Sequence, residues 1–180
     1  MSAPRSPSSP SPLHASARPS PDAPDGAQGP WIVVASRFHG VVVDALVAGA
    51  RECLAAAGVP DRRVRVGRVA GALEVPQAAA RVAALPPPGR PSGIVALAAV
   101  VRGETPHFEH VCREATRGLM EVALRSGIPV GFGVLTCDDL AQALARAGGE
   151  AGNKGHEAAA AALDLAAAVA GLDGPAAAPA

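Results

Sequence analysis

The chain alternates between two hydrophobic periodicities. Short runs in which every residue or every second residue is apolar predict four strands, at 31–36, 63–70, 93–101 and 128–136. Between and after these runs, apolar residues recur at every third or fourth position, which predicts five helices, at 42–57, 71–85, 107–126, 138–147 and 153–171. The helix at 107–126 has the clearest pattern, because charged residues four positions apart lie opposite its apolar face.

The order of these elements predicts the fold class. Strand and helix alternate four times at intervals of about thirty residues, which is typical of a parallel sheet with helices on both faces. The run at 93–101 is continuously apolar, as expected for a central strand that is covered on both sides. We therefore predict an α/β protein, a three-layer α/β/α sandwich built on a four-stranded parallel sheet.

Both ends of the chain differ in composition from the part between them. Residues 1–30 consist mainly of proline, serine and alanine, and they contain too little apolar surface to offset the entropy of ordering. We expect a disordered arm over 1–30, a folded domain over 31–172 and a frayed tail over 173–180.

Composition and charge exclude several classes of function. Apolar residues make up 49% and aromatic residues 2% of the chain, so we expect a core of alanine, valine, leucine and isoleucine. The formal net charge is zero, which leaves no overall positive field to attract nucleic acid or an anionic membrane. No segment reaches the roughly 18 uninterrupted apolar residues of a membrane span. We therefore expect neither nucleic acid nor a membrane as a partner.

The cysteines bear on compartment and on metal binding. Cys53, Cys112 and Cys137 are odd in number and widely spaced. The N-terminal residues lack the apolar segment of a signal peptide, so we expect free thiols and a cytoplasmic location. None of the cysteines has a histidine at the spacing of zinc ligands, and we expect no metal site.

The segment "VVRGETPHFEHVC" at 100–112 places polar residues where a predicted strand passes into a helix. In open parallel sheets, ligands bind beyond the carboxyl ends of the strands. Thr105 suits an N-cap and Pro106 the first helical position, so this helix start offers N–H groups that can hold a phosphate. His107 would lie beside that anion and could exchange a proton near neutral pH. The alternative is that Thr105 and Pro106 only start a helix and that His107 is an exposed surface residue.

Two other segments carry candidate ligand groups, each with a simpler alternative. Arg146 and Lys154 flank a glycine-rich turn and could bind a phosphate together with backbone N–H groups. The same residue types are also expected at a helix end that is capped by glycine. Glu74, at the start of a predicted helix, could accept hydrogen bonds from a ligand or only complement the helix dipole.

Five segments together resemble the lumazine synthase family. They are "SRFHG", "GALEVP", "ALAAVVRGETPHFEHVCREATRGL", "GIPVGFGVLT" and "RAGGEAGNKG", and they follow one another in the family's order. The resemblance extends over residues 31–171 and implies a flavodoxin-like fold. It also implies the family's reaction, which condenses 5-amino-6-(D-ribitylamino)uracil with 3,4-dihydroxy-2-butanone 4-phosphate and releases phosphate and water. The product is 6,7-dimethyl-8-ribityllumazine, made in the penultimate step of riboflavin biosynthesis. The family needs no metal or organic cofactor.

The resemblance assigns roles to individual residues. His107 matches the proton-transferring histidine of the family. The pyrimidine and the ribityl chain would be bound by Phe38, Ala72, Leu73, Glu74, Ala99, Val100, Val101 and Phe132. The phosphate would be bound by Glu104, Thr105 and Arg146, with Lys154 as a further candidate. Phe132, Arg146 and Lys154 would come from a neighbouring subunit. The resemblance therefore implies a homo-oligomer with active sites at subunit interfaces.

The family's assembly and partners are implied in the same way. Its members form pentamers and in some cases hollow icosahedral shells, and the sequence leaves this choice open. Riboflavin synthase, which uses the product, is the expected partner besides the small-molecule substrates. Three residues depart from the common family pattern: His39 stands for asparagine, Leu73 for an aromatic residue and Cys137 for threonine. None of these changes removes a group that the resemblance assigns to catalysis.

Two other functions fit parts of the sequence. A non-catalytic module that binds a flavin or a pyrimidine would keep Phe38 as a stacking surface but would not need His107 and Arg146 together. A structural shell paralogue would be expected to lose Glu74, His107 or Arg146, and all three are present. The sequence therefore favours the synthase over both alternatives.

Overall fold

The predicted strands form one parallel sheet with β1 and β3 at its centre. The computed structural model describes residues 29–173. In chain order the strands are β1 Trp31–Ser36, β2 Val64–Val69, β3 Gly93–Val101 and β4 Val130–Cys137. Their order across the sheet is β2-β1-β3-β4, and each neighbouring pair is parallel. The carboxyl ends of the strands therefore meet at the same edge of the sheet.

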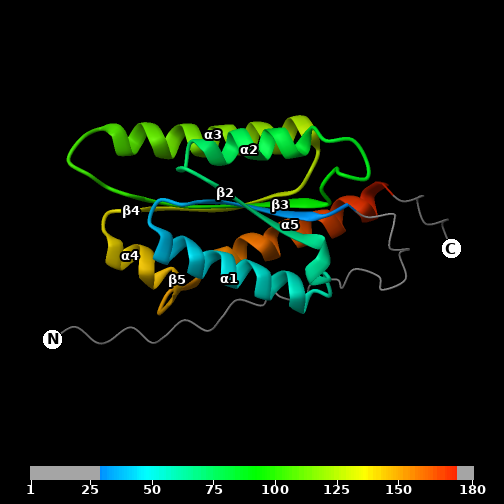
Figure 1. Cartoon of the computed structure of the whole chain (residues 1–180), viewed down its shortest axis with the longest axis horizontal. Coiled ribbons are helices and arrows are strands. Elements are labelled where there is room, and N and C mark those ends of the chain that lie inside the picture. Colours follow the sequence, from blue (N-terminus) through cyan, green and yellow to red (C-terminus); the bar gives the residue numbers. More distant parts are fainter. Residues whose placement is uncertain (1–28, 174–180) are drawn as a thin grey trace.

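Helices cover both faces of this sheet. They are α1 Gly40–Ala56, α2 Glu74–Ala83, α3 His107–Ser126, α4 Leu140–Ala145 and α5 Lys154–Asp173. Figure 1 shows α2 and α3 on one face of the sheet and α1, α4 and α5 on the other. The predicted three-layer α/β/α sandwich is confirmed.

Each face of the sheet has its own hydrophobic core. Val95 and Leu97 of β3 belong to the core that includes buried residues of α1 and α5. Ile94 and Ala96 belong to the core that includes buried residues of α2 and α3. Successive side chains of a strand point to opposite faces, so a continuously apolar strand contributes to both layers. Full burial of a valine, leucine or isoleucine side chain stabilises the fold by about 1.5–3 kcal/mol.

Several element boundaries differ from the prediction. β3 and α3 span the predicted residues, and the predicted helix at 71–85 is confirmed in its central part, at Glu74–Ala83. A short 3-10 helix, Asp61–Arg63, precedes β2 and was not predicted. β4 starts two residues later than predicted and ends one residue later.

The glycine-rich segment between α4 and α5 differs most. The sequence predicted a turn between two helices, but Ala147–Gly149 (β5) and Gly152–Asn153 (β6) form a small antiparallel hairpin. Gly148 and Gly152 adopt positive φ angles of 109° and 76°, a region that favours glycine. These two glycines let the chain reverse within a few residues, which shortens α4 to six residues.

The described part of the chain begins just before β1. The Gly29 carbonyl accepts hydrogen bonds from Arg63 Nη2 and Ser92 Oγ, at 2.6 and 2.9 Å. The Pro30 carbonyl accepts one from the Ser92 N–H at 2.9 Å. The rest of the predicted arm and the predicted tail beyond Asp173 lie outside the described residues. Among residues 29–173, no helix is both long enough and apolar enough to cross a membrane.

Candidate functional site

A pocket lies at the carboxyl edge of the sheet, where β1 and β3 end and where α2 and α3 begin. Its volume is about 370 Å³, within the usual range for sites that bind small molecules. The lining residues are Phe38, His39, Gly71, Ala72, Leu73, Glu74, Ala99, Val100, Val101, Gly103, Thr105, His107, Phe108 and Val111. This is the position at which open parallel sheets bind ligands.

Phe38 supplies the aromatic surface of the pocket. The loop after β1 is held in place because the Arg37 and Phe38 N–H groups donate to Val69 and Ala70 carbonyls, at 2.8 and 3.3 Å. The Phe38 side chain is 67% exposed, so its ring is available to a planar ligand. A large exposed aromatic residue beside a pocket is suited to stacking.

His39 lies next to this aromatic surface and was not predicted to line the pocket. It occupies the N-cap of α1 with φ 54° and ψ 50°, a left-handed conformation that few residues other than glycine adopt. Its imidazole ring meets the Phe38 ring edge to face, with centroids 4.7 Å apart. The contact orients the Phe38 ring from one side.

Glu74 brings a carboxylate to the pocket at the first residue of α2. Its Oε2 accepts a hydrogen bond from the Gly71 N–H at 2.8 Å, which folds the side chain back over the loop that enters the helix. The carboxylate is thereby oriented, and Oε1 can still accept a hydrogen bond from a ligand. Leu73 and Glu74 are both exposed, whereas Ala72 is buried in the core below them.

The end of β3 and the start of α3 form the opposite wall. Ala99 is buried and Val100 and Val101 are half-buried. Val100 packs against the core shared with α2 and α3, whereas Ala99 and Val101 pack with the core on the other face of the sheet. Thr105 and His107 follow in the loop and the first turn of α3, and both are exposed. His107 is therefore accessible to a ligand that lies against β3.

The helix start differs from the prediction by one position. Thr105 was expected at the N-cap and Pro106 at the first helical position, but Pro106 is the N-cap and His107 begins the helix. Pro106 has φ −60° and ψ −4°, and its carbonyl accepts from the Glu109 and His110 N–H groups. The N-terminal turn of a helix still carries N–H groups without intrahelical acceptors, so the predicted anion site moves by one residue only.

A cluster of charged side chains, Arg102, Glu109 and Asp138, joins this helix start to the ends of β3 and β4. The sequence analysis did not predict it. Arg102, the first residue after β3, donates from Nε to Asp138 Oδ1 at 2.9 Å and from Nη1 to Glu109 Oε1. These hydrogen bonds from the guanidinium hold the pKa values of Glu109 and Asp138 below their ordinary range. The sequence does show an arginine immediately after a buried strand. It does not show the partners of this arginine, because Asp138 is 36 positions away and Glu109 lies on the next helix.

Four predicted site residues do not line the pocket of the described chain. Glu104 lies between two residues that do, Gly103 and Thr105. Phe132 lies early in β4, pairs with Ala96 and is 45% exposed. The other two are on separate elements: Arg146 caps the C-terminus of α4, and Lys154 begins α5.

The side chains of Arg146 and Lys154 bond within their own segments, and the Lys154 N–H donates to the Arg146 carbonyl at 2.8 Å. Arg146 Nη1 donates to the Gln142 carbonyl at 3.0 Å, and Lys154 Nζ donates to both oxygens of Glu157 at 2.8 and 2.7 Å. The structure therefore gathers most of the predicted residues at one place and leaves these two cations and Phe132 away from it.

The pocket has few polar groups, and these are not arranged to bind a metal. Residues 29–173 contain no group of three or more His, Cys, Asp or Glu side chains that could hold a metal ion. The polar side chains of the lining are those of His39, Glu74, Thr105 and His107. In such a pocket a planar ring can stack on Phe38, hydroxyl groups can donate hydrogen bonds to Glu74, and His107 can transfer a proton.

Comparison with known families identifies this arrangement. The family model described as 6,7-dimethyl-8-ribityllumazine synthase matches residues 30–170. The chain belongs to this family. The match covers the whole sheet and every residue that lines the pocket, so the predicted resemblance to lumazine synthases is confirmed.

Individual relatives agree with the family match. The 6,7-dimethyl-8-ribityllumazine synthase of Desulfovibrio desulfuricans is 49% identical over 132 residues, which cover 73% of this chain and 83% of the relative. That of Nitratidesulfovibrio vulgaris strain Miyazaki F is 50% identical over 134 residues, covering 74% and 84%. At this identity and coverage, the lumazine synthases are relatives over the whole domain and not only at the pocket.

Proposed function

We propose that the chain catalyses the condensation of 5-amino-6-(D-ribitylamino)uracil with 3,4-dihydroxy-2-butanone 4-phosphate to form 6,7-dimethyl-8-ribityllumazine. The observation that carries this proposal is the pocket in which Phe38, Glu74 and His107 meet, in a chain of the lumazine synthase family. A stacking surface, an oriented carboxylate and a proton-transferring group are what a planar pyrimidine with a polyhydroxyl side chain would need.

The pyrimidine substrate would lie between Phe38 and the end of β3. Its ring would stack on the exposed Phe38 side chain. The backbone of Ala99, Val100 and Val101 would bind the ring edge, because the last residues of a strand present N–H and C=O groups beyond the sheet. The ribityl hydroxyl groups would donate to the Glu74 carboxylate, whose orientation the Gly71 N–H already fixes.

The phosphate of the second substrate would bind at the start of α3. The N–H groups of the loop and of the first helical turn, near Glu104 and Thr105, favour an anion, and the helix dipole adds to this preference. Such a site holds the phosphate without a metal ion. It also places the butanone carbon atoms next to His107.

His107 would move protons during the reaction. Attack of the primary amine of the pyrimidine on the ketone gives an imine with loss of water. Elimination of phosphate then needs a proton to leave the carbon chain, and ring closure by the ribityl-bearing nitrogen releases a second water. An imidazole at the pocket wall can accept and return these protons, and such assistance typically raises a rate about 10²–10⁴-fold.

The remaining predicted residues lead us to propose a homo-oligomer. Phe132 is exposed on an edge strand, and Arg146 and Lys154 lie outside the pocket of their own chain. We propose that a neighbouring copy supplies these three residues to the site, with Arg146 binding the phosphate. Riboflavin synthase, which would use the product, is the further partner that this function implies. The free thiols of Cys53, Cys112 and Cys137 agree with a cytoplasmic location.

A direct assay tests the proposed function. Purified full-length protein would be mixed with both substrates in a buffer without added metal, and lumazine formation followed by absorbance and fluorescence together with phosphate release. We expect product well above the uncatalysed background, and equal amounts of lumazine and phosphate. Background rates from an assembled oligomer that still binds the pyrimidine would favour the non-catalytic binding module instead.

A further inference from the structure

Arg102 joins three elements at the edge of the sheet that holds the pocket. It is the first residue after β3, and its N–H donates to the Cys137 carbonyl at the end of β4, at 2.9 Å. Its guanidinium reaches Asp138, directly after β4, and Glu109, in the first turn of α3. The same guanidinium lies over the Phe108 ring, with Cζ 4.2 Å from the ring centroid.

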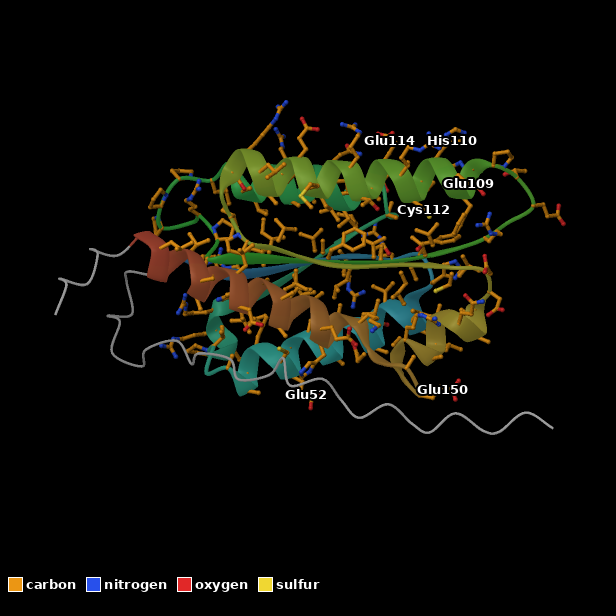
Figure 2. The ribbon with its side chains drawn as sticks, turned by 180° about the vertical axis from the view of Figure 1, so that it is seen from behind. Glu52, Glu109, His110, Cys112, Glu114 and Glu150 are labelled. Atoms are coloured by element: carbon orange, nitrogen blue, oxygen red, sulfur yellow. The ribbon has the colours of Figure 1, made fainter. Side chains whose placement is uncertain are left out.

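These contacts act on the turn that carries His107. Phe108 is buried and lines the pocket, and it is the residue next to His107 in the chain. Figure 2 shows Glu109 near the end of α3 where the loop from β3 enters it, whereas His110 and Glu114 point away from the sheet. Arg102 thus contacts the two residues that directly follow His107, from the side of the strands.

We propose that Arg102 is a positioning residue that holds the first turn of α3, and with it His107, against the carboxyl ends of β3 and β4. The inference rests on the proposed function, since it concerns the proton transfer assigned to His107. A displacement of about 1 Å of a reacting group can reduce a rate by about 10²-fold. A cluster that fixes the turn therefore acts on turnover, and more weakly on the affinity for the phosphate that the same turn would bind.

The geometry requires an arginine and not only a positive charge. The planar guanidinium directs Nε to one carboxylate and Nη1 to another while its face covers the Phe108 ring. A lysine ammonium has no planar face and no fixed fork, so it cannot make the same three contacts. The charge alone would keep an attraction to Glu109 and Asp138, but it would not fix the angle of the turn.

Arg117 offers a matched control on the same helix. It also bonds two carboxylates, donating to Glu114 at 2.9 Å and to Glu121 at 3.1 Å. All three residues belong to α3, so this cluster joins no other element. Replacing Arg117 removes a similar exposed charge cluster without releasing the helix start from the strands.

The experiment compares Arg102→Gln and Arg102→Lys with Arg117→Gln in the full-length oligomer. Steady-state rates would be measured with each substrate varied, and amide hydrogen exchange would be followed over residues 107–111. For Arg102→Gln we expect kcat to fall about 10- to 100-fold, with faster exchange in the first turn of α3. KM for the ribitylaminouracil should stay within about 3-fold of the wild type, and KM for the butanone phosphate should rise by less than kcat falls, because its phosphate would bind to the same turn. Arg102→Lys should recover only part of the rate, and Arg117→Gln should match the wild type.

Three results would overturn the proposal. Unchanged kcat and unchanged exchange in Arg102→Gln would do so while wild-type turnover still supported the proposed function. A large rise in KM for the butanone phosphate with an unchanged kcat would make Arg102 a substrate-binding residue. Full recovery with lysine would show that charge without geometry is sufficient.

The experiment also allows for a variant that does not fold and for a wild type that is inactive. If Arg102→Gln does not fold, Glu109→Ala and Asp138→Ala each remove one acceptor of the guanidinium, and we expect a fall in kcat of about 3- to 10-fold for each. No loss in either would count against the proposal. If the wild type proves inactive, the proposed function fails, and exchange in the first turn alone decides whether Arg102 holds α3.

Discussion

Two groups of predicted site residues have different surroundings in this fold. The pocket group, at the ends of β1 and β3 and the starts of α2 and α3, is brought together within one chain. The outer group lies outside that pocket and consists of Phe132 on β4, Arg146 directly after α4 and Lys154 at the start of α5. A parallel sheet gathers the loops at its carboxyl edge automatically, because every strand ends there. We propose that residues that lie elsewhere on the fold join this site through another copy of the chain.

The contacts of the two groups differ in the same way. In the pocket group, backbone and side-chain bonds orient the groups that face the ligand, as between Gly71 and Glu74. In the outer group, Arg146 and Lys154 bond to their own segments, through Gln142 and Glu157. The comparison predicts that Phe38, Glu74 and His107 of the pocket group govern turnover and pyrimidine binding. It also predicts that Arg146 of the outer group strengthens binding of the phosphate.

The largest effect is expected from the pocket residue His107. Replacing it with alanine should lower kcat by about 10²–10⁴-fold, since proton transfer loses its carrier. Binding of the ribitylaminouracil should change little, because Phe38 and Glu74 remain. Steady-state kinetics and a fluorescence titration would separate the two effects. His110→Ala, an exposed histidine of the same helix that points away from the sheet, is the control, and equal rates in both variants would contradict the role of His107.

Arg146 in the outer group should affect affinity instead. Hydrogen bonds to charged groups contribute about 1.5–3 kcal/mol. Arg146→Ala should therefore raise KM for the butanone phosphate about 10- to 100-fold, with a smaller change for the pyrimidine. Arg125→Ala, which removes an exposed arginine paired with Glu121 on α3, is the control. A variant of Arg146 with normal KM for both substrates would remove it from the site.

Phe38 should show a moderate and selective effect. Aromatic stacking contributes about 0.5–1.5 kcal/mol beyond the area that it buries. Phe38→Ala should raise KM for the ribitylaminouracil about 10-fold, and Phe38→Trp should restore binding. Thermal stability should hardly change, because the side chain is 67% exposed. A large fall in melting temperature would mean that the ring has a structural role and not a binding one.

The smallest effect is the one expected on the stability of the fold from the Arg102 cluster, which links the pocket side of the sheet to the end of β4. Its guanidinium lowers the pKa values of Glu109 and Asp138. A lowered carboxyl pKa stabilises the fold above the ordinary value of about 4 and loses this effect as the pH falls through the lowered value. The stability difference between wild type and Arg102→Gln should therefore be constant from neutral pH to about pH 5 and shrink below about pH 4.

Denaturant unfolding at several pH values would measure this difference. The groups are exposed, so we expect a small contribution at every pH. If the stability difference between wild type and Arg102→Gln grew on acidification, its sign would contradict the lowered pKa values of Glu109 and Asp138. Other titratable groups would then dominate the pH dependence of stability. The Arg117→Gln variant provides the reference for a charge cluster within one helix.

Much of the fold was predictable because its signals are local. A glycine followed by eight apolar residues in a row is expected to be covered on both sides, and this placed β3 at its observed bounds, Gly93–Val101. The spacing of apolar and charged residues did the same for α3. The pattern also placed segments with candidate ligand groups at the ends of strands and the starts of helices. The roles of individual residues such as Phe38 and Ala99 came from the resemblance to lumazine synthases.

The features that were missed depend on backbone angles or on distant partners. The hairpin of β5 and β6 needs positive φ angles at Gly148 and Gly152, and a glycine-rich run does not say which of its glycines adopt them. Thr105 suited an N-cap by residue type, but the chain places Pro106 there instead. Arg102 bonds Asp138 across 36 positions, which no local pattern can reveal.

The measurement that tests the two-group account most directly mixes two defective variants. Arg146→Ala and His107→Ala chains would be co-expressed with different tags, purified as mixed oligomers and assayed at low butanone phosphate. If one site takes its pocket group and its outer group from neighbouring copies, random mixing should give intact sites at about one quarter of the interfaces. The mixed oligomers should then be far more active than either variant alone. Activity equal to the average of the separate variants would contradict a site that is shared between copies.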